Sequence, residues 1–118
     1  MFGLHVVAKS HLHLYQHYPW LDNVMHLAGG VAIAFFFLVS WRAAVASGRA
    51  GRPAAMVTGL LVASLTCAAA VGWEFVEYLS DRLLHTSMQM SLEDTLSDLA
   101  LGIVGGLAVA AAAWWRSR

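Results

Sequence analysis

Three long stretches of the chain carry no charged residue, and they constrain its fold more than any other feature of the sequence. They contain 19, 21 and 17 residues, at positions 23–41, 53–73 and 99–115. A helix that crosses the roughly 30 Å hydrocarbon core of a bilayer needs about 20 mainly apolar residues, so each stretch is suited to one crossing. A soluble three-helix bundle would need a polar face on each helix, which these stretches lack. The sequence therefore predicts an integral membrane protein.

The predicted fold is all-α, with three transmembrane helices in an antiparallel bundle. We expect these helices at about residues 22–43, 54–80 and 94–115, within one transmembrane domain at 20–118. Composition agrees, because 59% of the 118 residues are hydrophobic and 12% are charged, whereas about a quarter of an average soluble chain is charged. The lipid bilayer is thus the expected partner. Nucleic acid is not expected, because a chain with zero net charge has no general attraction for it.

Residues 1–19 form a different, His-rich segment that precedes the predicted helices. Three of its four histidines and its one lysine recur every four residues, and apolar side chains occupy another face. This pattern predicts an amphipathic helix that lies in the membrane interface and ends near Pro19. The alternation of His and Leu at positions 11–14 also fits a short strand.

The charged residues are segregated between the two ends of the predicted bundle. Five of the seven basic residues fall at one end, and all seven acidic residues and all six histidines fall at the other. The positive-inside rule places the basic end in the cytoplasm. We therefore expect a multi-pass protein of the bacterial inner membrane, with its amino terminus outside and its carboxy terminus in the cytoplasm.

Acidic residues and one histidine at the outer end form pairs on the predicted helices. Six residues lie three or four positions from a partner, which places each pair on one helix face: Asp22 with His26, Glu74 with Glu77, and Asp94 with Asp98. Antiparallel packing brings these three faces to one level, just below the outer interface. Ionised carboxylates are costly at that depth, and they repel one another unless they are protonated, paired or neutralised by a cation.

A divalent cation would offset this excess of negative charge, because Asp, Glu and His together are ligands suited to zinc, manganese or iron. We therefore predict a metal site drawn from these six residues, with Glu74 and Asp98 as ligands or as general acid and base groups. Asp22 and Asp94 have a simpler explanation as helix caps, since both lie near the amino-terminal ends of their helices. The prediction depends most on the other four residues, which are His26, Glu74, Glu77 and Asp98.

Local structure explains several other polar and small residues. Ser91 and Asp94 follow the S-x-x-D capping pattern for the third helix. We expect Asp81 and Glu93 to be solvated charges of the loop before it.

Small residues within the helices predict close helix packing. Gly29 and Gly30 are adjacent in the first helix, and Gly102 and Gly106 form a GxxxG motif in the third. Such residues let helix backbones approach each other, either within one chain or between copies. A homo-oligomer, or a larger membrane partner bound through Gly102 and Gly106, is therefore an expected use of this face.

The order of these motifs resembles small bacterial membrane proteins of the VanZ-like and YjdF-like type. Three motifs over roughly residues 20–108 carry the resemblance: Asp22-x-x-x-His26-x-x-Gly-Gly, Trp73-Glu74-x-x-Glu77, and Asp94-Thr-x-x-Asp98-x-x-x-Gly102-x-x-Gly105. The chain departs from the VanZ-like pattern at Asn23, where a basic residue is usual, and at Glu77 and Asp98, where Gln and Asn are frequent. These acidic residues bring it closer to the YjdF-like branch. The resemblance implies a role in the cell envelope and one shared site, and it implies no settled reaction.

Two functions are compatible with these features. In the first, an outward-facing Asp/Glu/His site binds a divalent metal ion or a polar headgroup and acts on a substrate of the envelope. In the second, the protein is a non-enzymatic small membrane subunit whose buried carboxylates lock the helices together and whose glycine face binds copies or a larger partner. A proton or cation pathway is disfavoured, because the inner halves of the helices are uncharged.

Overall fold

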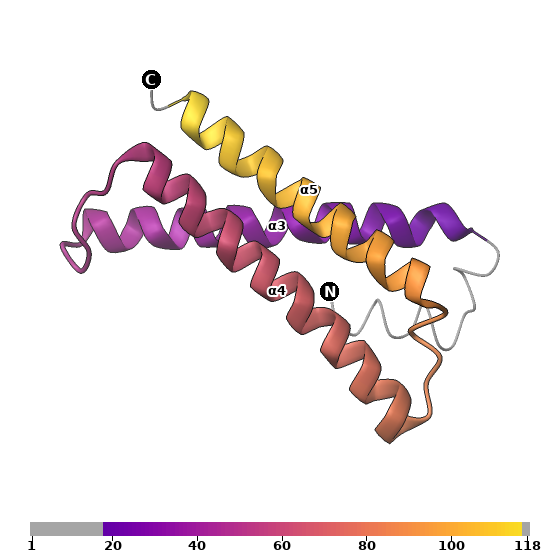
Figure 1. The fold of residues 1–118 in the computed structure, drawn as a ribbon. Coiled ribbons are helices and arrows are strands. Elements are labelled where there is room, and N and C mark those ends of the chain that lie inside the picture. The colour runs from indigo at the N-terminus through magenta and orange to yellow at the C-terminus, as the bar shows by residue number, and fades with distance from the viewer. Residues whose placement is uncertain (1–17, 117–118) are drawn as a thin grey trace.

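The computed structural model describes residues 18–116, and these residues form three helices and no strand (Figure 1). Helix α3 comprises Pro19–Ala46, α4 comprises Ala55–Leu84 and α5 comprises Leu92–Trp115. The predicted all-α class is confirmed, and the helices lie within a few residues of their expected bounds. The His-rich segment expected to be an interfacial helix lies almost wholly outside the described residues.

Each of the three helices is long and apolar enough to cross a membrane. They contain 28, 30 and 24 residues, more than the roughly 20 that a perpendicular crossing needs, so tilted crossings are expected. Large apolar side chains remain on the outside of the bundle, and Phe35 and Phe36 are 60% and 63% exposed. Exposing such a surface to lipid costs little free energy, whereas exposing it to water is unfavourable. The prediction of an integral membrane protein is confirmed.

The ends of the helices have local causes in the sequence. Helix α3 begins at Pro19, whose ring suits the first position of a helix. Its last turn is followed by Gly48 with a φ of 74°, and α4 is followed by His85 with a φ of 54°, so both helices are closed by a left-handed residue. Ser91 caps α5. The connections between the helices are therefore short, at residues 47–54 and 85–91.

The chain passes back and forth along the bundle, so that the start of α3, the end of α4 and the start of α5 lie toward the same end (Figure 1). A small apolar core of Ala34, Leu38 and Val62, with Val109 and Ala113 against it, lies toward the opposite, basic end. Four carboxylates and a threonine are the buried polar residues among those described: Asp22, Glu74, Glu77, Asp98 and Thr66. The interior of the acidic half is therefore polar.

Helices α3 and α5 touch through their backbones at glycines. A Cβ atom on Gly30 would overlap the carbonyl oxygen of Gly102, and one on Gly105 would overlap the carbonyl oxygen of Leu27. A side chain larger than hydrogen at Gly30 or Gly105 would therefore force the helices apart.

The GxxxG motif is used inside the chain. Gly102 and Gly106 are both buried, and a Cβ on Gly106 would lie 2.6 Å from the Cγ2 atom of Thr66 in α4. Of the two expected roles, packing within one chain and packing between copies, the structure thus supports the first. This packing does not present Gly102 and Gly106 as a surface for a second copy.

The backbone contact at Gly30 predicts a large effect of one methyl group. Gly30→Ala should destabilise the bundle by about 1–3 kcal/mol or more, because the obstacle is rigid backbone. Gly29→Ala is the matched control, since its added Cβ meets nothing within 4 Å and the change favours helix by about 1 kcal/mol. Thermal unfolding in detergent measures both. Equal melting temperatures for the two variants would contradict the packing described here.

Candidate metal centre

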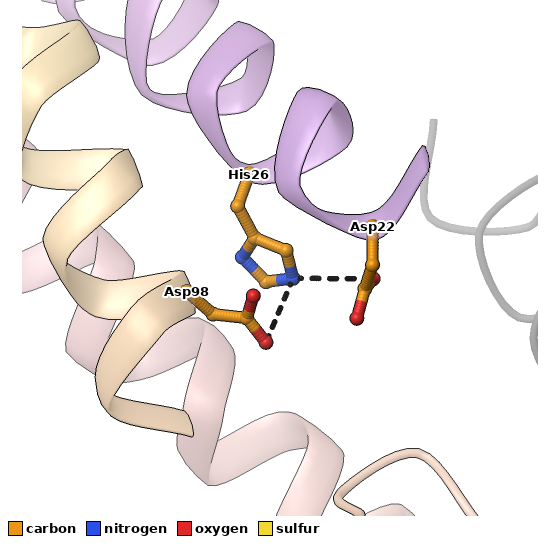
Figure 2. Close-up of side chains that lie close together, drawn as sticks. All are labelled: Asp22, His26 and Asp98. Atoms are coloured by element: carbon orange, nitrogen blue, oxygen red, sulfur yellow. Dashed lines mark ion pairs between the residues drawn. The ribbon is translucent and has the colours of Figure 1, made fainter. Parts of the chain in front are cut away.

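Three ionisable side chains from two helices converge near the acidic end of the bundle (Figure 2). The Nε2 atom of His26 lies 3.7 Å from Oδ1 of Asp22, one turn earlier in α3, and 3.4 Å from Oδ2 of Asp98 in α5. Asp22 and Asp98 are each 2% exposed, and the His26 side chain is 9% exposed. One ligand atom of each residue lies within 4.8 Å of the other two. These are buried groups that face each other.

The glycine contact explains why Asp98 can reach His26. Gly30 follows His26 by four residues, and Gly102 follows Asp98 by four, so the polar pair lies one turn from the point where the backbones touch. An aspartate side chain is short, and it spans the space between helices only where their axes are close. The same contact therefore packs the helices and brings the carboxylate within 3.4 Å of the imidazole.

The spacing of these donor atoms suits a small divalent ion. Two ligands bound to zinc at about 2.0–2.1 Å in tetrahedral geometry lie about 3.3–3.4 Å from each other. The distances of 3.4 and 3.7 Å from His26 to the two carboxylates are close to that separation. The same distances also fit a protonated imidazole that forms ion pairs with both carboxylates. The geometry thus supports a metal centre or an ionic link between α3 and α5.

A cleft of about 190 Å³ adjoins the three-residue cluster and is lined by residues of all three helices. His26, Glu74 and Asp98 are the ionisable residues that line it. The remaining lining residues are apolar or small, or, like Thr66 and Trp73, have one polar group: Met25, Gly29, Gly30, Ala32, Ile33, Thr66, Ala70, Trp73 and Gly102. The cleft therefore combines one charged region with an apolar wall, and it places Glu74 beside the cluster.

The two glutamates of α4 lie in different surroundings. The side-chain amide of Gln89 donates to Oε2 and to the backbone oxygen of Glu74, both at 3.3 Å. The indole N–H of Trp73 donates to Oε1 of Glu77 at 2.8 Å, and Glu77 is 1% exposed. Glu74 lines the cleft, whereas Glu77 lies neither in the cluster nor in the cleft lining.

Asp94 lies in the cap of α5. Its backbone N–H donates to Oγ of Ser91 at 3.1 Å, and its Oδ2 accepts from the backbone N–H of Met90 at 3.4 Å. The predicted S-x-x-D capping pattern is thus confirmed. Of the six ligands proposed from the sequence, the structure brings together Asp22, His26 and Asp98, with Glu74 beside them, and it places Glu77 and Asp94 elsewhere.

Asp81 was expected to be a solvated loop charge, and this expectation is wrong. It lies in the last turns of α4, where its carboxylate accepts hydrogen bonds from Oγ1 of Thr86 at 2.6 Å and from the backbone N–H groups of Met88 and Gln89 at 2.7 and 2.9 Å. These bonds fold the loop back onto α4, and Met88 becomes fully buried. Asp81 thereby presents Gln89 to Glu74. Glu93, the other expected loop charge, is exposed as expected but lies in the first turn of α5 and not in the loop.

Gln89 is a site residue that reasoning from the sequence missed. Its partner Glu74 lies 15 positions earlier, so no helical or strand spacing relates them. The available signal is Asp81, because aspartates near the ends of helices often accept hydrogen bonds from the following backbone. That signal predicts a folded loop, and it does not indicate which side chain of the loop contacts Glu74.

The role of Asp81 predicts a loss of stability in Asp81→Asn. The amide nitrogen that replaces one carboxylate oxygen cannot accept a hydrogen bond, so a backbone N–H of the loop loses its partner at a cost of about 1–3 kcal/mol. Glu93→Gln removes an exposed charge at the same end of the bundle and serves as the control. Chemical unfolding in mixed micelles measures both. A variant Asp81→Asn that is as stable as Glu93→Gln would refute the loop contact.

The comparisons with known proteins agree with the fold. The family described as "Predicted membrane protein (DUF2238)" matches residues 1–118, which is the whole chain. No curated protein and no solved structure matches the chain. The chain therefore belongs to the DUF2238 family of membrane proteins.

Proposed function

We propose that this membrane protein binds a divalent metal ion through Asp22, His26 and Asp98, and that it acts in the bacterial cell envelope. Zinc, manganese and iron are the ions that two carboxylates and one imidazole favour. The observation that carries the proposal is the approach of three buried ligand atoms, from two helices, to within 4.8 Å of one another.

The charge of the acidic end supports a bound cation. Asp22, Asp98 and Glu74 are buried carboxylates near a single imidazole, so even a protonated His26 would leave an excess of negative charge if all three are ionised. Buried charges of one sign are costly in the low dielectric of a bundle interior. A divalent ion beside a neutral imidazole offsets more of this charge than one proton does.

The cleft supports a chemical role for the ion. Three protein ligands leave a coordination position for water or for a substrate, as in catalytic zinc sites. Glu74 lines the same cleft and is the candidate general base, while Asp98 acts as a ligand. The apolar walls would accommodate a substrate with an apolar part, such as an envelope lipid.

Two features support an outward-facing envelope location. The motifs that surround the cluster resemble those of VanZ-like and YjdF-like proteins. In addition, arginines gather at the end opposite the cluster, and the positive-inside rule assigns that end to the cytoplasm. The cluster would then face the outer side of the inner membrane.

A second function is favoured by one observation, the 3.4 Å approach of His26 to Asp98 across two helices. An ion pair at this position would lock α3 to α5 in a non-enzymatic membrane subunit. This function requires a protonated imidazole and no metal. The two proposals therefore differ in what they predict for metal content.

Metal analysis of the purified protein separates the two functions. The protein should be prepared without a polyhistidine tag and with the four histidines of residues 1–17 replaced by glutamine, because these could bind metal themselves. After loading with zinc and desalting, elemental analysis should find about one ion per chain. Asp98→Asn and His26→Asn should each reduce this to a small fraction of one ion.

The matched control for His26→Asn is His85→Asn. His85 is exposed at the same end of the bundle, and asparagine tolerates its left-handed backbone. This variant should bind zinc as the parent does. If the parent binds no zinc, manganese or iron, or if His26→Asn lowers the melting temperature while metal content is unchanged, the metal proposal fails and the ionic lock is supported.

A further inference from the structure

A second and larger cavity, of about 680 Å³, lies at the basic end of the bundle, far from the acidic cluster along the chain's three helices. Side chains from the end of α3, the start of α4 and the end of α5 form its walls. Its polar residues include Trp41, Arg42 and Arg52. None of the seven acidic residues of the chain lines it.

The charge around this cavity favours an anion. Arg42 and Arg52 are among the residues that line it, and Arg49 and Arg116 belong to the same end of the bundle. All acidic residues fall at the other end, so no acidic side chain offsets these arginines locally. Arginine presents several donors in a planar fork that matches phosphate oxygens. Basic pockets between transmembrane helices bind lipid phosphates by this means.

Two further donor groups belong to residues that line the cavity, and they lack an acceptor or a cap in the described part of the chain. The indole N–H of Trp41 is buried and has no hydrogen-bond partner there. An orphaned buried donor costs free energy unless a ligand or water satisfies it. The amino-terminal end of α4 has no side-chain cap, and its residues Ala55 and Thr58 line the cavity. A helix amino terminus attracts anions through its free N–H groups and its dipole.

The remaining walls of the cavity are apolar. Leu38, Val62 and Ala110 line its inner side, toward the middle of the bundle. An anion alone would leave these walls in contact with water, whereas an amphipathic ligand would cover them. The cavity also lies at a bundle end flanked by tryptophans, the level at which lipid headgroups meet the membrane interface.

We propose that this basic cavity binds the phosphate group of an anionic phospholipid. Arg42 and Arg52 hold the phosphate oxygens, the Trp41 N–H donates to one of them, and the acyl chains cover the apolar inner wall. This site is separate from the proposed metal centre, so either proposal can fail without the other.

Native mass spectrometry of the full chain in a neutral detergent tests the proposal. Phosphatidylglycerol, phosphatidylcholine and inorganic phosphate should be added in separate titrations. One phosphatidylglycerol should bind about tenfold or more tightly than phosphatidylcholine, because its headgroup has a net negative charge. The double variant Arg42→Gln/Arg52→Gln should weaken this binding about tenfold or more, and Trp41→Phe should weaken it by a few-fold.

The matched control is Arg49→Gln. Arg49 is an exposed arginine of the same end, and it does not line the cavity. This variant should bind phosphatidylglycerol as the parent does. Melting temperatures without added lipid show whether each variant is folded. If the double variant does not fold, Trp41→Phe still tests the proposal, because it preserves an aromatic ring and removes only the N–H donor.

Two results would overturn the proposal. The first is equal affinity for phosphatidylglycerol in Arg42→Gln/Arg52→Gln and Arg49→Gln, together with no effect of Trp41→Phe. The second is binding of inorganic phosphate without preference for phosphatidylglycerol over phosphatidylcholine, which would make this a site for a free anion.

Discussion

The backbone contact between Gly30 of α3 and Gly102 of α5 is the interaction on which the rest of this structure depends. It sets how close the two helices lie, and one turn away the same closeness lets Asp98 reach His26. In lipid, helices gain little from burying apolar surface against each other, so such small-residue contacts and polar links supply much of the association. The packing and the candidate site are thus consequences of the same two glycines.

The bundle places different chemistry at its two ends. The acidic end has a polar interior, in which Asp81 folds the α4–α5 loop back and Gln89 meets Glu74 beside the cleft. The basic end has an apolar core and a wide cavity lined by arginine. A net charge of zero conceals this division, because the seven acidic and seven basic residues are counted together. A polar site and a lipid contact can therefore coexist in 118 residues.

Hydropathy and helical spacing predicted three membrane helices and one site drawn from six residues, of which the structure brings together Asp22, His26 and Asp98. Spacing shows which residues share a face, and antiparallel order shows which faces reach one level. Neither determines how far each helix is rotated about its axis. For α3 and α5 the glycine contact sets that rotation, so Asp98 faces His26. Glu77 belongs to α4, where it accepts a hydrogen bond from Trp73 of its own helix. The hydrogen bonds of Asp81 run five to eight residues ahead into an irregular loop, where no periodic pattern applies.

The central claim is that close approach of two helices assembles a metal centre, and the zinc affinity of Gly30→Ala tests it most directly. Gly30 supplies no side chain to the site, and a Cβ at this position would push α5 away from α3. Competition with a chromophoric chelator should show affinity about tenfold or more below that of Gly29→Ala. Zinc binding of equal strength in the two variants, or no binding in the parent protein, would contradict the account.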